Sequence, residues 1–179
     1  GANNTAVGHL ALSANTTANL NTAVGQCALK TNTTGSHNSA FGVPALLCNT
    51  TGACNSAFGR LALCANTTAD SNTAVGYAAL KVNTTGDRNV AMGDQAGNSN
   101  TTGRLNTFIG GKDAPGWPVA NYNTTGCCNV AIGNGSLKSN TTADHNTTVG
   151  YNSLWSNTTG ANNAAFGNYA LYSNTTANN

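Results

Sequence analysis

The stretch Asn72-Thr-Ala-Val-Gly-Tyr-Ala-Ala-Leu-Lys-Val-Asn-Thr-Thr-Gly-Asp-Arg88 is one copy of a repeat that fills almost the whole chain of 179 residues. Its opening pattern, Asn-x-x-x-Gly, begins ten times, at residues 4, 21, 38, 55, 72, 89, 106, 129, 146 and 163. Successive copies start 17 residues apart, except that the copy beginning at Asn106 carries six extra residues. Repetition at a fixed short period is typical of stacked, solenoid architectures. The repeat therefore decides the fold.

Some positions of the repeat hardly vary. Counted from the opening asparagine as position 1, position 4 is always apolar, position 5 is always glycine and position 9 is leucine in eight copies. An Asn-Thr-Thr triplet occupies positions 12 to 14 in every copy, and the residue after it is only Gly or Ala. Positions 6, 7, 10, 11, 16 and 17 vary freely and hold nearly all the charge. The pattern indicates an interior formed by the first set and a surface formed by the second.

Each copy is too short for the two packed helices of a helical repeat, which need about 30 residues or more. We predict one strand at positions 2–4, where Thr/Ser/Val-Ala-Val/Phe/Ile suits a half-buried pleated surface. The glycine at position 5 then turns the chain, because glycine takes positive φ freely. A second strand is predicted at about positions 8–11, around the leucine, and Asn-Thr-Thr-Gly/Ala closes the rung as a turn.

The predicted fold is therefore all-β: a β-solenoid of ten 17-residue rungs, one with a six-residue insertion, forming a single repeat array over residues 1–179. One rung cannot bury its own face, so stacking should create a thin continuous core of Val/Phe, Leu and Ala. At ~4.8 Å per rung, ten rungs would make a rod of roughly 48 Å. The asparagines at positions 1 and 12, such as Asn72 and Asn83, are expected to stack into amide ladders.

The six extra residues lie within 111–122, and we predict that this segment protrudes as a loop. Insertions in solenoids become loops on one face, which is often the binding face. Trp117 and Tyr122, with Lys112 nearby, are the candidate ligand contacts, because an exposed aromatic ring could stack on a sugar. The alternative is that Trp117 packs over the rod or against a neighbouring chain.

Asn-Thr-Thr is also an N-glycosylation sequon. One reading makes its asparagine an inward or turn-forming ladder residue, and the other makes the rod a glycan-coated fibril. The two readings are mutually exclusive at each rung, because a glycan requires the asparagine to point outward. The candidate glycosylation sites are Asn15, Asn32, Asn49, Asn66, Asn83, Asn100, Asn123, Asn140, Asn157 and Asn174.

Composition argues against several classes of function. Charged residues make up only 7% of the chain and its formal charge is +2, so there is no basic patch for nucleic acid or for an anionic membrane. No apolar run approaches the ~18 residues of a transmembrane helix. The six cysteines form no CxxC pair, and we predict no metal and no cofactor. Of the three histidines only His145 has an acidic neighbour, Asp144, and no catalytic motif is present, so the chain is predicted not to be an enzyme.

The repeat resembles those of phage and environmental tail-fibre proteins, which often lie upstream of an endosialidase-type chaperone domain. Asn89-Val-Ala-Met-Gly93 and Asn129-Val-Ala-Ile-Gly133 are also similar to the head repeats of trimeric autotransporter adhesins. The resemblance covers all ten copies and implies a left-handed β-roll, trimeric, on a surface-exposed fibre. The adhesin repeats are somewhat shorter, and trimerisation is implied by the resemblance alone.

We therefore predict a structural protein, the rod of an extracellular fibre or fibril at a cell or virion surface. Self-association is expected, either as a trimer or as an end-to-end filament, because neither terminal copy looks like a cap. The first alternative is an adhesin or receptor-binding module that recognises surface glycans. The second is an ice-binding protein, because the paired threonines form ranks along the rod. Adjacent strand residues point to opposite faces, so only one threonine of each pair would face outward.

Overall fold

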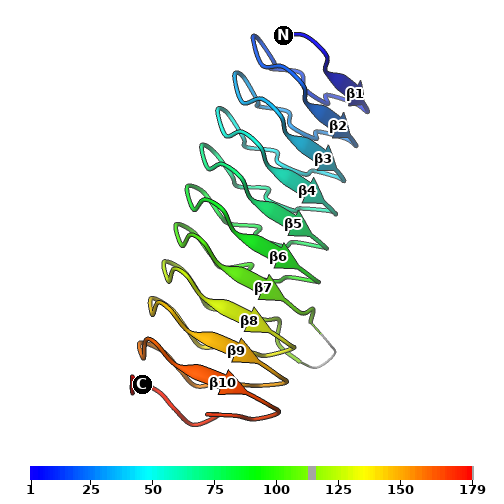
Figure 1. Ribbon diagram of the computed structural model, residues 1–179. Helices are drawn as coiled ribbons and strands as arrows, with labels where there is room; N and C mark the ends of the chain where they lie inside the picture. Colours follow the sequence, from blue (N-terminus) through cyan, green and yellow to red (C-terminus); the bar gives the residue numbers. More distant parts are fainter. Residues whose placement is uncertain (113–115, 179) are drawn as a thin grey trace.

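The computed structural model describes residues 1–112 and 116–178, and these form a rod of stacked rungs with the termini at opposite ends (Figure 1). Each copy of the repeat contributes one three-residue strand, and rungs 1 to 10 are numbered after these strands. The strands are β1 (Thr5–Val7), β2 (Thr22–Val24), β3 (Ser39–Phe41), β4 (Ser56–Phe58), β5 (Thr73–Val75), β6 (Val90–Met92), β7 (Thr107–Ile109), β8 (Val130–Ile132), β9 (Thr147–Val149) and β10 (Ala164–Phe166). The described residues contain no helix long and apolar enough to cross a membrane.

The strands form one ten-stranded sheet in which each strand pairs with the next along the chain. Every pairing is parallel and in register, so equivalent positions of the repeat lie above one another. Between β4 and β5, for example, Ala57 pairs with Ala74 and Phe58 pairs with Val75. The predicted all-β solenoid is confirmed.

The glycine at position 5 has two reasons to be invariant. Its φ lies between 120° and 145° in all ten rungs, a region that side-chain-bearing residues avoid. The rungs also approach closely here: a Cβ added to Gly76 would lie 2.4 Å from the carbonyl oxygen of Gly93 in the next rung. Any side chain at this position would therefore push two rungs apart.

The predicted second strand at positions 8–11 does not form. Residues at position 9 adopt positive φ in every rung, as at Leu80 (49°), and so do those at position 7, as at Ala78 (55°), except where that position is proline, in rungs 3 and 7. The segment runs as successive turns. Rung-to-rung hydrogen bonds continue on this side all the same; the Leu63 N–H donates to the Ala79 carbonyl oxygen (3.1 Å). These bonds and the burial of leucine offset the strain of a left-handed residue, which costs about 1–2 kcal/mol.

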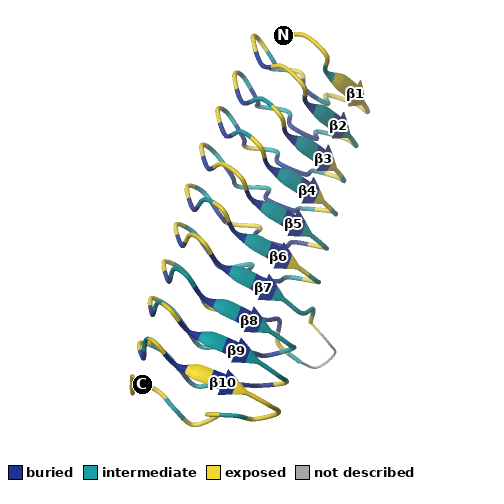
Figure 2. Cartoon of the chain, in the orientation of Figure 1, coloured by how far each residue is buried: buried dark blue, intermediate teal, exposed yellow. Residues whose placement is uncertain are grey.

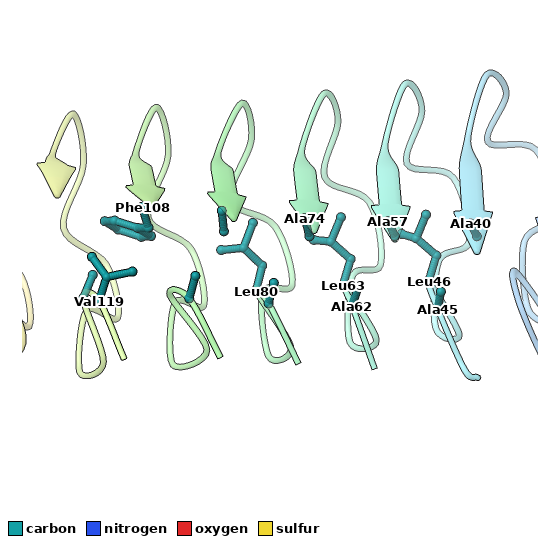
Figure 3. Packing of buried hydrophobic residues seen from close by; sticks show 14 of the residues in the cluster. Ala40, Ala45, Leu46, Ala57, Ala62, Leu63, Ala74, Leu80, Phe108 and Val119 are labelled. Atoms are coloured by element: carbon teal, nitrogen blue, oxygen red, sulfur yellow. The ribbon is translucent and has the colours of Figure 1, made fainter. Parts of the chain in front are cut away.

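The core is narrower than predicted and consists mainly of alanine and leucine. In rung 4 these residues are Ala57 at position 3, Ala62 at position 8 and Leu63 at position 9, all fully buried. Figure 3 shows each leucine reaching across the rod toward the strand alanine of the following rung, as Leu63 does toward Ala74. The prediction that position 4 belongs to the core is wrong. Because the middle residue of a three-residue strand points inward, its neighbours point outward, and Phe58 is 39% exposed.

Both asparagine rows lie inside and form ladders, as predicted, but with different partners. In the position-12 row the side-chain amides bond to one another, as Asn49 Nδ2 donates to Asn32 Oδ1 (2.8 Å). In the position-1 row the oxygen accepts from the next backbone, as the Asn38 N–H donates to Asn21 Oδ1 (2.9 Å). Asn38 and Asn49 also both donate through Nδ2 to the carbonyl oxygen of Gly52, each at 2.8 Å. The ladders therefore pair buried backbone groups that would otherwise lack partners.

Rungs 6 and 7 keep the strand pairing and register but change the core. Position 9 is Gly97 in rung 6 and Ala120 in rung 7 instead of leucine, and position 3 of rung 7 is the fully buried Phe108 instead of alanine. A Cβ added to Gly97 would lie 2.5 Å from Phe108 Cδ2, so the ring occupies the space that a leucine fills elsewhere. In Figure 3 the ring lies across the interior toward Val119. A large residue on one side and a small one on the other keep the core filled.

Rungs 8 and 9 replace core alanines by hydroxyl residues that bond to one another. Ser136, Thr148 and Ser153 are all fully buried. The Ser136 hydroxyl lies 2.6 Å from Thr148 Oγ1 and 2.9 Å from Ser153 Oγ. Thr148 also donates to the Val130 carbonyl oxygen (3.2 Å). Since all three hydroxyls have partners, the polar substitutions carry little of the cost of an unpaired buried group.

Candidate functional site

The outer sheet face, formed by positions 2 and 4 of the ten strands, carries no charged side chain. Position 2 supplies mostly Thr and Ser, and position 4 supplies a continuous apolar row. Figure 2 shows partial exposure along the strands, and within the row Phe58 and Met92 are exposed. Phe41 and Phe58 stack, with ring centroids 5.0 Å apart and planes at 8°. The row comprises Val7, Val24, Phe41, Phe58, Val75, Met92, Ile109, Ile132, Val149 and Phe166.

The candidate glycosylation sites lie on the inside of the rod. Of the ten asparagines, only Asn15 and Asn174, in the end rungs, are partly exposed; the eight between them are fully buried. The amide nitrogen of Asn66 donates to Asn49 Oδ1 (2.8 Å) and to the Ala69 carbonyl oxygen (3.1 Å). A nitrogen that is buried and donates two bonds cannot carry a glycan in the folded rod. The glycan-coat reading is corrected at these eight positions, and the ladder reading holds there.

The two threonines of each triplet differ, as predicted from their adjacency. The first donates to the backbone of the next rung; Thr67 Oγ1, for example, lies 3.1 Å from the Thr84 carbonyl oxygen. The second is exposed in every rung. One single-file rank of exposed threonines therefore runs along the rod.

The insertion places Trp117 beside the rod, where it contacts the next rung. Lys138 Nζ in rung 8 lies 4.6 Å from the Trp117 ring centroid and 5.3 Å from that of Tyr122. The two rings are 6.2 Å apart and tilted by 44°. Both remain 42% exposed. The predicted pair Trp117 and Tyr122 is therefore brought together, and packing over the rod and exposure to a ligand are compatible.

Lys112 is not part of this cluster. It lies on the entering limb of the insertion, where its backbone N–H donates to the Asp94 carbonyl oxygen (3.1 Å). The cation that joins the two rings is Lys138. Residues 113–115, which the sequence places in the predicted loop, lie outside the described residues.

Sequence reasoning missed four further aromatic residues that continue the cluster. Lys138 Nζ also lies 4.4 Å from the ring centroid of Trp155 in rung 9. Trp155 stacks on Tyr172 in rung 10, with centroids 6.0 Å apart and planes at 16°. We call the whole set the aromatic strip; its members are Trp117, Tyr122, Lys138, Trp155, Tyr172, Tyr169 and Tyr151.

The strip continues laterally through the last two tyrosines. Tyr169 lies 5.3 Å from Tyr172 and 5.6 Å from Tyr151, measured between ring centroids. A sequence signal existed: the rings of the strip occupy positions 6, 7, 10 and 11 of rungs 7 to 10, and equivalent positions of the rungs stack. Because those positions lie in turns and not in a strand, their shared face could not be read from a two-residue period.

The acidic residues at position 16 have a structural role. Asp70 Oδ1 accepts from the Ala53 backbone N–H (2.7 Å), and Asp144 Oδ1 accepts from that of Cys127 (2.7 Å). Each carboxylate therefore caps the preceding rung. Among the described residues no three His, Cys, Asp or Glu side chains gather closely enough to hold a metal ion.

The cysteines are free thiols, and two of them are neighbours across rungs. The Cys48 backbone N–H donates to the Cys64 carbonyl oxygen (3.0 Å). Burial raises the pKa of the Cys64 thiol, and the nearby Cys48 raises it further, whereas the Lys81 ammonium lowers it. A raised pKa leaves less of the reactive thiolate at neutral pH.

Comparison of the chain with protein-family models, with curated proteins and with solved structures finds no match.

Proposed function

We propose that this chain is a structural element, the rod of an extracellular fibre exposed on a cell or virion, and that it has no enzymatic activity. The observation that carries the proposal is the continuous in-register pairing of all ten rungs around two internal asparagine ladders. Each rung adds the same backbone bonds and the same buried amides to its neighbours. Length and stability therefore both grow with the number of copies, which is what a passive rod requires.

The rod is proposed to self-associate through its outer sheet face. A contiguous exposed apolar patch on a soluble protein commonly marks an interaction site, and this row runs the length of the rod. The surface of a second copy repeats at the same rung spacing of ~4.8 Å, so its apolar row can match this one along the full length. A trimer is the assembly implied by the resemblance to adhesin head repeats.

Light scattering after size-exclusion chromatography tests the association. We expect a mass three times the 17.9 kDa of one chain. Val75→Lys places a charge at the centre of the outer sheet face and is expected to give single chains, because burying an unpaired charge costs several kcal/mol. The matched control is Val82→Lys in the same rung, an exposed valine outside the strand.

Two results would contradict the proposal. A wild-type protein that remains a single chain at micromolar concentration would contradict the proposed self-association. If Val75→Lys and Val82→Lys dissociate to the same extent, the outer sheet face is not the interface. Electron micrographs of the same samples add the shape, for which straight particles of constant width are expected.

Ice binding is the weaker alternative. It requires ordered ranks of outward hydroxyl and methyl groups, and the triplets present one free rank, at position 14. The hydroxyls at position 13 are engaged with the backbone, as at Thr50. Thermal hysteresis of the purified chain measures this activity directly, and the structural proposal expects none above that of a control protein at equal concentration.

A further inference from the structure

The tyrosines and tryptophans of this chain are concentrated at one end of the rod. Of five tyrosines and two tryptophans, all except Tyr77 belong to the aromatic strip in rungs 7 to 10. Their rings form one connected series of contacts, with centroid separations between 5.3 and 6.2 Å and Lys138 Nζ bridging the two tryptophans. The series crosses four rungs, a length of roughly 14 Å at the rung spacing.

The rings are held in place and yet exposed. Trp155 lies against rung 8 where position 7 is Gly135, and a Cβ added there would lie 2.6 Å from the indole Cζ3. Tyr151 and Tyr169 are 43% and 51% exposed. Rings that pack only to fill a core would be buried, whereas these keep one side in contact with the rod and the other in solvent.

The surroundings of the strip are neutral and rich in hydrogen-bonding groups. Position 11 beside the strip is serine in rungs 8, 9 and 10: Ser139, Ser156 and Ser173. From residue 116 to residue 179 the only charged side chains are Lys138 and Asp144. Asp144 caps the Cys127 backbone N–H at position 16, away from positions 10 and 11, so Lys138 is the charge that the strip presents.

We propose that the aromatic strip binds an extended anionic carbohydrate chain lying along the rod axis. Indole and phenol rings combine an apolar body with a polar edge, which suits the C–H faces and hydroxyl groups of sugars. The serine hydroxyls add neutral donors and acceptors, and the Lys138 ammonium attracts a carboxylate or sulfate group. Single-stranded nucleic acid is disfavoured, because its binding grooves need a row of cations and the strip has one.

The test measures binding of a hexauronate oligosaccharide to the full chain by isothermal titration calorimetry. Trp117→Ala and Tyr172→Ala remove rings at the two ends of the strip without touching Gly135. By analogy with base stacking on aromatic side chains, each is expected to weaken binding about tenfold. Lys138→Gln is expected to abolish the weakening of binding that added NaCl causes in the wild type, since screening acts only on the charge contact.

Tyr77→Ala is the matched control. Tyr77 is 42% exposed and has its own cation partner, Arg60, 5.6 Å from its ring, but it stands alone in rung 5. It is expected to leave binding unchanged. Absence of hexauronate binding by the wild type overturns the proposal, as does an equal loss in Tyr77→Ala. A change of oligomeric mass in Trp117→Ala or Tyr172→Ala would assign the strip to a second copy of the chain and also overturn it.

The carbohydrate site is independent of the proposed rod. A single chain that binds the oligosaccharide through Trp117 and Tyr172 would support the site and contradict self-association. A trimer that fails to bind would do the opposite, so the two proposals fail separately.

Discussion

Rungs 2 to 5 and rungs 6 to 9 share the same strand pairing from rung to rung, but they fill the core with different side chains. In rungs 2 to 5 every core position holds the repeat residue, with alanine at positions 3 and 8 and leucine at position 9. In rungs 6 to 9 that pattern is broken at Gly97, Phe108, Val119 and Ala120, and again at the hydroxyl trio of Ser136, Thr148 and Ser153. All of these residues are buried, and strand register is unchanged throughout.

The difference shows what the fold requires and what it tolerates. Backbone hydrogen bonds, the position-5 glycine and the asparagine ladders are kept in both regions, so they define the rung. Core side chains are exchangeable as long as volume or hydrogen bonding is balanced between neighbouring rungs. Rungs 7 to 10, which overlap the substituted region, are also those that carry the aromatic strip.

The largest effect is expected from breaking the balance between rungs 6 and 7. Phe108→Ala removes the largest fully buried side chain and is expected to cost about 3–5 kcal/mol of unfolding free energy. Gly97→Leu alone overfills the same space, because its Cβ would lie 2.5 Å from Phe108 Cδ2. The double variant places leucine at position 97 and alanine at position 108, which is the arrangement of Leu80 and Ala91 one rung earlier. It is expected to recover most of the lost unfolding free energy.

Urea unfolding of the two single variants and the double variant measures this coupling as a double-mutant cycle. The backbone does not oppose leucine at this site, since Gly97 has a φ of 57° and the leucine at position 9 of rung 5, Leu80, has 49°. Losses that simply add in the double variant would show that Phe108 and Gly97 are not a compensating pair. The two regions would then differ in a way that packing does not explain.

Much of this architecture was predictable from the repeat, for reasons visible in particular residues. Ten glycines at a fixed position predicted a turn with positive φ, and ten asparagines at each of two fixed positions predicted ladders, because stacking multiplies one local requirement. The inward side of the strand was not predictable in the same way. In Thr73-Ala74-Val75 either the alanine or the larger apolar valine could face the core. Ala74 faces inward because the rod is too narrow for a larger side chain there. The leucine turns and the aromatic strip depend on left-handed residues that hydrophobic periodicity does not report.

An intermediate effect is expected from the ladder that both regions share. Asn66 in rung 4 and Asn140 in rung 8 have matched surroundings, each donating to the preceding asparagine (2.8 and 2.7 Å) and to an alanine carbonyl oxygen (3.1 and 3.0 Å). Either residue changed to alanine leaves a buried carbonyl and the amides of both neighbouring asparagines with one partner fewer, at a cost of about 1–3 kcal/mol. Urea unfolding is expected to give nearly equal losses for Asn66→Ala and Asn140→Ala. A much larger loss in rung 8 would mean that the substituted region depends on its ladder more than the regular region does.

The smallest effect concerns reactivity, not stability, and lies on the surface of the regular region. Burial and the nearby Cys48 raise the pKa of Cys64, while Lys81 lowers it. The thiolate is the form that reacts with iodoacetamide, and a raised pKa means less thiolate at a given pH. The midpoint of the plot of alkylation rate against pH should therefore lie at higher pH in the folded chain than in urea. Cys48→Ser should move the midpoint part of the way back, since burial remains, and Lys81→Gln should move it further up. Mass spectrometry of the peptide spanning 61–81 follows Cys64 alone, because trypsin cleaves after Arg60 and Lys81 and the peptide contains no other cysteine. In Lys81→Gln the peptide extends to Arg88 and still contains no other cysteine. If the midpoint pH of alkylation is the same in the folded chain and in urea, Cys64 is as accessible to solvent in rung 4 as it is in the unfolded chain. The regular rungs would then hold their outer positions less firmly than their core.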